Sequence, residues 1–155
     1  MPKLLMLVGI AGSGKDTFVK NVLNHEVLST DQYIQKIADE SRKTFNEVFS
    51  ESIDFATSQF NIKTMEMIKN KESFVWNQMN IFKKSRLKKL KRFPKDYEKI
   101  CIYFDTPLDV LLQRNEVRRL TNRHLRSNLI EKWYNQLEVP TVDEGFDYVY
   151  TIKGE

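Results

Sequence analysis

A glycine-rich loop near the start of the chain constrains the fold more than any other segment. Residues 9–17 read GIAGSGKDT; they follow an apolar run at 4–8 and precede a helix-like stretch from Phe18 to Asn24. Glycine permits the left-handed backbone that such a turn needs, so that successive N–H groups converge on one anion. The helix that follows adds the partial positive charge of its N-terminus. Strand, glycine loop, lysine and helix together predict a phosphate-binding P-loop.

The residues of this loop are expected to bind the phosphates of a nucleotide, with Lys15 reaching the β- and γ-phosphates. Asp16 stands where Ser or Thr usually offers a hydroxyl to Mg²⁺. A carboxylate is a hard oxygen ligand that also suits Mg²⁺, and Thr17 either supplies a hydroxyl to the metal or only begins the helix. The predicted metal ligands are thus Asp16 and Thr17. The predicted nucleotide-binding residues of the loop are Gly9, Ala11, Gly12, Ser13, Gly14, Lys15, Asp16 and Thr17.

Length and composition predict a single globular domain over residues 1–155. The 155 residues are 41% hydrophobic and 30% charged, which is typical of a folded domain with a core. No apolar run approaches the roughly 20 residues of a transmembrane helix, and the first predicted strand begins at once, which leaves no room for a signal peptide. Cys101 is the single cysteine, so we expect neither disulfides nor a zinc cluster, and a cytoplasmic location without a membrane partner.

Positive charge is concentrated in the second half of the chain. Nine Lys and Arg residues lie between residues 83 and 99, and five arginines lie between 114 and 126. The first group is typical of a nucleic-acid-binding patch, and the alternative is a solvated helix face. The second group suits bidentate phosphate contacts. The residues predicted to bind nucleic acid are Lys83, Lys84, Arg86 and Lys88.

Alternating apolar patterns predict an α/β fold with a five-stranded parallel sheet and helices on both faces. Ligands of such sheets gather at the carboxyl ends of the strands, where Gly9 to Asp16, Thr30-Asp31, Asn77 to Asn80 and Asp105 are expected to lie. The expected strands are residues 3–8, 26–28, 74–78, 100–105 and 148–152. The expected helices are residues 15–24, 32–70 with a break near 41–44, 81–92, 108–120 and 125–137, with a polar stretch at 121–124.

Four phenylalanines recur along the long middle helices, at positions 45, 49, 55 and 60. Aromatic side chains at such spacing either pack in the core or form a platform on which bases stack. We expect all four to belong to the core.

Further motifs follow the P-loop in a fixed order. They are STDQY at 29–33, NQMN at 77–80 before the basic run, YFDTP at 103–107, LQRN at 112–115, LEVP at 137–140 and EGFD at 144–147. In this order the chain resembles the kinase domain of bacteriophage-type polynucleotide 5′-kinases, a branch of the small P-loop kinases. The resemblance spans nearly the whole chain.

The resemblance implies a P-loop kinase fold with an arginine-bearing lid, and phosphorylation of the 5′-hydroxyl end of DNA or RNA by ATP and Mg²⁺, as in nucleic acid end repair. By position, Lys15 would bind the β- and γ-phosphates, and Asp31 would be the general base that takes the hydroxyl proton. The alternative role of Asp31 is to cap a helix. Arg118 would be the lid arginine that neutralises the transferred phosphoryl group, and Arg114, on the same helix face, would assist at the nucleotide.

Three positions depart from the family pattern. Asp16 replaces Ser or Thr, Ile34 replaces an arginine that contacts an acceptor phosphate, and Asn77 replaces an Asp at the end of the third strand. Two alternatives therefore stay open. One is a P-loop kinase of a small acceptor such as a nucleoside monophosphate, and the other is a nucleotide-binding module with weak catalysis.

Overall fold

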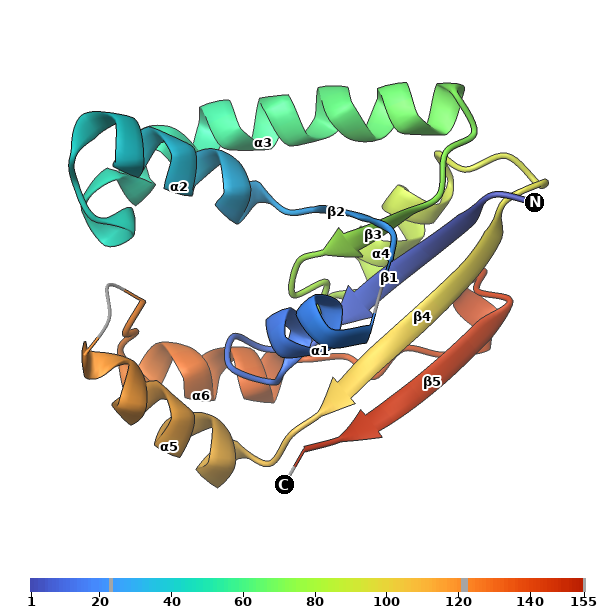
Figure 1. Cartoon of the computed structure of the whole chain (residues 1–155). Coiled ribbons are helices and arrows are strands. Elements are labelled where there is room, and N and C mark those ends of the chain that lie inside the picture. Colours follow the sequence, from blue (N-terminus) through green and yellow to red (C-terminus); the bar gives the residue numbers. More distant parts are fainter. Residues whose placement is uncertain (23, 121–122, 155) are drawn as a thin grey trace.

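The computed structural model describes residues 1–22, 24–120 and 123–154, and in this part of the chain five strands form one parallel sheet (Figure 1). The order of the strands is β2-β3-β1-β4-β5, and every neighbouring pair is parallel. This confirms the predicted sheet and brings the carboxyl ends of β1 to β4 to one edge. The strands are β1 (Lys3–Val8), β2 (Glu26–Leu28), β3 (Phe74–Asn77), β4 (Glu98–Asp105) and β5 (Tyr148–Lys153).

The helices follow the predicted order, with ends that differ by a few residues. The predicted break near 41–44 is present, because Arg42 has a left-handed backbone (φ 56°) and the Thr44 hydroxyl accepts a hydrogen bond from Glu47 N at 3.2 Å, which begins a new helix. The predicted helical position of Leu23 and the polar stretch at 121–122 lie outside the described residues. The helices are α1 (Lys15–Val22), α2 (Thr30–Ser41), α3 (Phe45–Lys69), α4 (Lys83–Leu90), α5 (Leu108–Val117) and α6 (Ser127–Gln136), with short 3-10 helices η1 (Arg118–Leu120) and η2 (Val142–Glu144).

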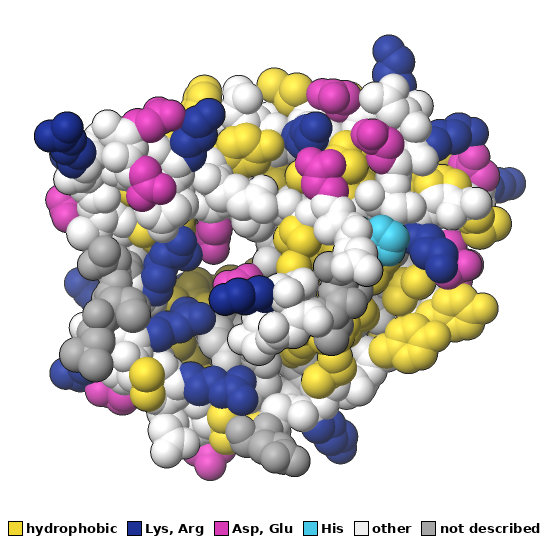
Figure 2. Space-filling view, viewed as in Figure 1, with side chains coloured by type: hydrophobic (Ala, Val, Ile, Leu, Met, Phe, Trp, Pro, Cys, Tyr) yellow, Lys and Arg dark blue, Asp and Glu magenta, His cyan; other side chains and the backbone are white. Residues whose placement is uncertain are grey.

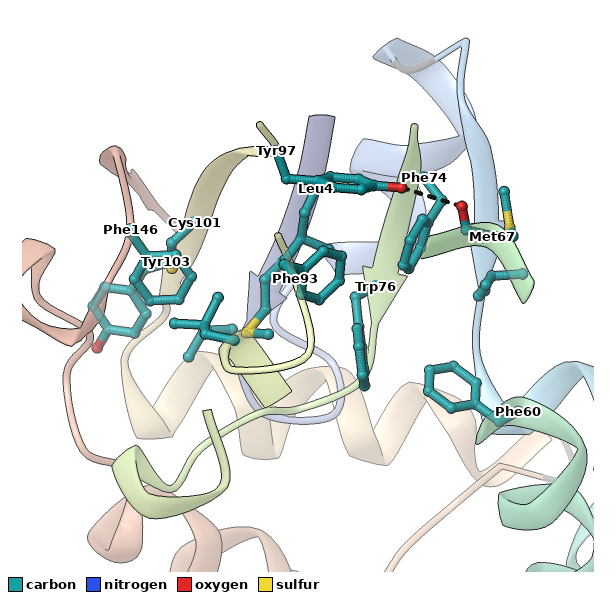
Figure 3. Close-up of a cluster of buried hydrophobic side chains, with 14 residues drawn as sticks. Leu4, Phe60, Met67, Phe74, Trp76, Phe93, Tyr97, Cys101, Tyr103 and Phe146 are labelled. Atoms are coloured by element: carbon teal, nitrogen blue, oxygen red, sulfur yellow. Dashed lines mark hydrogen bonds between the residues drawn. The ribbon is translucent and has the colours of Figure 1, made fainter. Parts of the chain in front are cut away.

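Both faces of the sheet are apolar because side chains alternate along each strand. On β1, Leu5 and Leu7 pack with Phe18 of α1 on one face. Leu4 and Met6 point to the other face, into a larger cluster with side chains of α3 and α4 (Figure 3). Helices therefore cover both faces, as predicted.

Aromatic side chains dominate the larger cluster. Trp76 lies edge-on to Phe60 of α3 at 5.2 Å between ring centroids, and Phe93 stacks near Phe74 at 5.9 Å. The hydroxyl of Tyr97 lies within hydrogen-bond distance of two carbonyl oxygens, Glu72 O at 2.6 Å and Met67 O at 3.2 Å, so its polar end is satisfied within the core (Figure 3). Burial of each large side chain contributes about 1.5–3 kcal/mol to the free energy of unfolding.

The long helix α3 corrects one expectation from the sequence. Phe45 and Phe60 are buried as predicted, but Phe49 and Phe55 are 41% and 56% exposed. The buried positions of α3 form one stripe that packs against α2 and the sheet, and the two exposed rings lie outside it. The expectation that all four rings are core was wrong for these two.

A separate apolar cluster fixes the helices beneath the carboxyl edge of the sheet. Ile10 of the P-loop and Ile81 after β3 pack with Leu111 of α5 and Ile130 of α6. This contact places the arginine-bearing end of α5 beside the loop. Within the described residues, no helix is both long enough and apolar enough to cross a membrane.

Arg86 does not belong to a nucleic-acid surface. Its guanidinium binds the Glu144 carboxylate through Nε at 2.6 Å and NH2 at 3.0 Å, and it donates to Asn80 O at 2.8 Å. The two side chains are 0% and 1% exposed. The prediction that Arg86 binds nucleic acid was wrong, because its side chain lies on the buried side of α4, where it pairs with a glutamate far along the chain.

We predict that the substitution Arg86→Met lowers the free energy of unfolding by about 3–5 kcal/mol, since it leaves the Glu144 carboxylate buried without its cation. Urea unfolding monitored by tryptophan fluorescence measures this change. The matched control is Lys84→Met on the exposed side of the same helix, which should change the free energy by less than about 0.5 kcal/mol. Equal effects of the two substitutions would contradict a structural role for the buried pair.

Candidate active site

The loop between β1 and α1 has the backbone conformation that its glycines predict. Gly12 and Gly14 have φ angles of 87° and 107°, in the left-handed region that L side chains rarely adopt. Gly9 is required for a different reason, since a Cβ there would lie 2.5 Å from Ser13 Oγ and 3.0 Å from Phe104 Cβ. Ala11 lies half-buried in the bend. The loop is thus compact and bends sharply before α1.

Three hydrogen bonds tie this loop to neighbouring segments. Gly9 N donates to Met79 O at 2.9 Å, and the Thr106 hydroxyl, just after β4, donates to Ser13 O at 3.1 Å. Arg114 of α5 donates to Gly12 O at 2.9 Å. The loop is therefore held between β3, β4 and α5, and Arg114, a predicted nucleotide-binding residue, contacts it.

Lys15 lies at the centre of the loop. Its Nζ donates to Gly9 O at 2.6 Å and to Ile10 O at 3.2 Å. Burial lowers the pKa of Lys15 to about 8; the charges of Asp16 and Asp31 raise it, and that of Arg118 lowers it. A triphosphate suits this site, since phosphate oxygens would supply stronger acceptors to a desolvated ammonium group than two carbonyl oxygens do.

Ser13 adds a second sign that the loop fits an anion. Its Oγ is buried and makes no hydrogen bond within the described residues. A buried hydroxyl without a partner is uncommon in folded proteins, and a phosphate oxygen at the loop would satisfy it.

Asp16 and Asn77 form a pair across the start of α1 and the end of β3. Asn77 Nδ2 donates to Asp16 Oδ1 at 2.9 Å, and the hydroxyl-bearing Thr17 is exposed one residue further along α1. In the described part of the chain, no group of three or more His, Cys, Asp or Glu side chains can hold a metal by itself. Oxygen donors at Asp16 and Thr17 fit Mg²⁺, which usually takes one or two protein ligands and completes its shell with phosphates and water.

Asp31 lies in the first turn of α2, in a cleft of about 640 Å³. Side chains of α1 and α2, the end of β3 and Arg123 line this cleft. Figure 2 shows a hollow on this side of the molecule between α2 and the α5–α6 region, with Lys and Arg side chains gathered along its rim. Ser29, not Asp31, is the N-cap residue of α2. Asp31 instead lines the cleft.

The charges around Asp31 come from several elements. Burial raises the pKa of Asp31, and the raising effect of Asp16 adds to it, whereas Arg123, Lys15 and Arg118 lower the pKa. The charge of Arg118, in η1, lowers the pKa of both Lys15 and Asp31.

Three other residues make contacts beside Asp31 that the sequence did not reveal. Lys89 donates to Gln78 Oε1 at 3.0 Å, and Gln78 Nε2 donates to the Thr30 hydroxyl at 3.2 Å, beside Asp31. Arg123 approaches Asp31 directly, with NH1 at 3.6 Å from Oδ2. These contacts join residues far apart in the chain, and the sequence showed only that Lys89 and Arg123 are basic.

The remaining predicted residues occupy other places. Lys83, Lys84 and Lys88 are exposed on α4, where they can meet a partner. Ile34 is fully buried in a cluster with Ala38 and does not line the cleft.

A family model described as an AAA domain (AAA_33) matches residues 4–140. The match covers most of the chain, and the chain therefore belongs to this family. No curated protein matches the chain.

Several solved structures share the fold at low sequence identity. A protein described as a kinase from Chloroflexus aurantiacus has a TM-score of 0.72 and 16% identity, covering 98% of this chain and 85% of that chain. A chain in the Pnkp1/Rnl/Hen1 RNA repair complex has a TM-score of 0.66 and 23% identity, covering 88% of this chain and 44% of its own length. Shikimate kinase from Acinetobacter baumannii has a TM-score of 0.56 and 21% identity, covering 100% and 84%. The chain has the P-loop kinase fold.

We predict that ATP affinity falls as pH rises above about 8. Lys15 is charged below its pKa of about 8 and neutral above it, so at higher pH the protein must take up a proton to bind the triphosphate. The dissociation constant should then rise about tenfold per pH unit. Calorimetric titration with ATP between pH 7 and 9.5 measures this dependence.

The control for this pH dependence is Lys15→Arg, whose guanidinium stays charged over the whole range. Its ATP affinity should be independent of pH, whatever its absolute value. A wild-type affinity that stays constant up to pH 9.5 would contradict the role assigned to the Lys15 ammonium.

We predict that the carboxylate and the amide of the Asp16–Asn77 pair can be exchanged. Mg²⁺ should increase the ATP affinity of the wild-type protein. In Asp16→Asn this increase should be smaller by a factor of about ten or more, because the carboxylate is lost. The double variant Asp16→Asn with Asn77→Asp should recover most of that gain. Titration of each protein with ATP, once with Mg²⁺ and once with EDTA, measures the effect of Mg²⁺ on ATP affinity. An equal effect of Mg²⁺ in the double and the single variant would contradict the prediction.

Proposed function

We propose that this member of the AAA_33 family is an ATP-dependent kinase that phosphorylates the 5′-hydroxyl end of DNA or RNA. The observation that carries the proposal is the position of Asp31: its carboxylate lines the same cleft as Asp16, which follows Lys15 in the P-loop. A base beside a phosphate-binding lysine is the arrangement that phosphoryl transfer to a hydroxyl requires.

In the proposed reaction, the acceptor hydroxyl donates a hydrogen bond to Asp31 and its oxygen attacks the γ-phosphorus. A new P–O bond forms, the bond between the γ-phosphorus and the bridging oxygen breaks, ADP leaves and Asp31 receives the proton. Lys15 and Arg118 would neutralise the charge on the transferred group, and Arg114 would hold the P-loop. Mg²⁺, held by Asp16 or Thr17, would neutralise the phosphates of ATP.

Two observations support a polynucleotide as the acceptor. Lys83, Lys84 and Lys88 stay exposed after Arg86 is assigned to the core, so α4 still presents a basic face. A chain of an RNA repair complex is among the proteins that share this fold. A basic face attracts a phosphate backbone irrespective of its sequence.

A small acceptor is the second candidate, and the size of the cleft favours it. About 640 Å³ lies within the range of pockets that enclose small molecules. Shikimate kinase shares the fold and phosphorylates a small molecule according to its name. In that case, the exposed lysines of α4 would be only a solvated face.

We predict that Asp31→Asn lowers the rate of phosphate transfer to a 5′-hydroxyl oligonucleotide by about 10³-fold or more, because the proton acceptor is lost. ATP affinity should change less than threefold, since the P-loop is untouched. Transfer of labelled γ-phosphate measures the rate, and Asp54→Asn on α3 is the control that should keep wild-type activity. Full activity of Asp31→Asn would contradict its role as the base.

We predict that replacing Lys83, Lys84 and Lys88 together by Gln weakens oligonucleotide binding and leaves ATP affinity unchanged. Each lysine that neutralises a phosphate contributes about one unit to the slope of log affinity against log salt, so the slope should fall by about 2–3. Fluorescence anisotropy of a labelled oligonucleotide at several salt concentrations measures it. An unchanged slope would assign these lysines to a solvated face and favour the small-acceptor alternative.

A further inference from the structure

Arg123 is built into the wall of the cleft by contacts with two helices. Its guanidinium lies 3.6 Å from the centre of the Phe45 ring, at the start of α3. Its NH2 donates to Gln35 Oε1 of α2 at 2.8 Å, and its NH1 lies 3.6 Å from Asp31 Oδ2. The stacking ring and the amide together fix the plane of the guanidinium and turn one edge toward the predicted base.

The contact with Asp31 is an ion pair rather than a close hydrogen bond. An N–H···O hydrogen bond usually spans 2.7–3.2 Å, and this N···O distance is 3.6 Å. Both groups are partly open to solvent, with 35% of the Arg123 side chain and 57% of the Asp31 side chain exposed. This ion pair is therefore accessible to a ligand in the cleft.

The chemistry of the proposed reaction requires Asp31 to receive a hydrogen bond from the acceptor hydroxyl. An acceptor that binds Asp31 in this way brings the rest of its structure to the adjacent wall, where Arg123 lies. A planar guanidinium held at a known orientation suits a phosphate, which accepts two parallel hydrogen bonds from it. Lys20 and Lys36 also line the cleft, but within the described residues no ion pair links either of them to Asp31.

We infer that Arg123 binds the first phosphodiester of the acceptor, the phosphate next to the nucleoside that carries the reacting hydroxyl. This inference rests on the proposed function and deepens it. Phe45 and Gln35 orient Arg123, and Arg123 holds the hydroxyl at Asp31 through the phosphate. A nucleoside that lacks this phosphate is then a poor acceptor, whereas a nucleoside 3′-monophosphate and an oligonucleotide are good ones.

Arg123 has a second effect that a purely structural residue would not have. Its charge lowers the pKa of Asp31, which burial raises. Replacing Arg123 by Gln therefore raises the pKa of Asp31, and the loss of activity on acidification should begin at a higher pH than in the wild-type protein.

The test compares kcat/KM of the wild-type protein and Arg123→Gln on two acceptors. The acceptors are a 5′-hydroxyl oligonucleotide and the same oligonucleotide with a neutral methylphosphonate at the first linkage. In the wild-type protein, the neutral linkage should lower kcat/KM by about 10- to 100-fold. Arg123→Gln should show low kcat/KM with both acceptors and less than a threefold difference between them. Lys132→Gln, which removes an exposed cation on α6, is the control and should discriminate as the wild-type protein does.

Two results would overturn the inference. One is an Arg123→Gln protein that discriminates between the acceptors as strongly as the wild-type protein does. The other is a wild-type protein that phosphorylates both acceptors equally well. Loss of structure in Arg123→Gln would reduce both activities by a common factor and leave the discrimination intact, so it is distinguishable from loss of the phosphate contact.

Failure of the proposed function gives a different pattern. If the wild-type protein phosphorylates no oligonucleotide, the polynucleotide kinase assignment fails, and anisotropy with the same two labelled oligonucleotides decides the role of Arg123. Tighter binding of the charged linkage by the wild-type protein, but not by Arg123→Gln, supports the phosphate contact. Equal binding of both linkages by the wild-type protein overturns it.

Discussion

The compact loop between β1 and α1 is the constraint on which the candidate site depends. Gly12 and Gly14 adopt the left-handed backbone conformation of the bend, and hydrogen bonds to neighbouring segments stabilise it. Hydrogen bonds with Met79 after β3, Thr106 after β4 and Arg114 of α5 supply this support. The sheet order places those neighbours, so the core that packs the sheet also positions the loop. The contacts of the sheet therefore also position the candidate phosphate-binding loop.

Around this loop, charged side chains are balanced by partners from distant segments. Lys15 is desolvated and bonded to carbonyl oxygens, Asp16 is paired with Asn77, and Asp31 faces Arg123. Each arrangement leaves a group that a phosphate, a metal ion or a hydroxyl could bind in place of its present partner. Such preset side chains lower the cost of reorganisation when a substrate binds.

Much of the fold could be predicted from the sequence because its signals are local. The glycine spacing predicts the loop, and the apolar patterns predict the strands and the break between α2 and α3. The errors concern contacts between distant residues. In the sequence, Arg86 is one of many cations in a basic run. Its burial depends on an ion pair with Glu144, which lies far along the chain. The contact of Arg123 with Asp31 also joins residues far apart in the chain, so the sequence could not predict it. The exposure of Phe49 and Phe55 shows that helical spacing alone does not predict which side of α3 is buried.

The proposed reaction is the transfer of phosphate from ATP to the end of a polynucleotide by this P-loop domain. Its most direct test offers labelled ATP and Mg²⁺ to two pools, one of 5′-hydroxyl DNA and RNA oligonucleotides and one of nucleosides and nucleoside monophosphates. We expect label to enter the oligonucleotides. Label only in the small acceptors, or tight ATP binding without transfer to either pool, would contradict it.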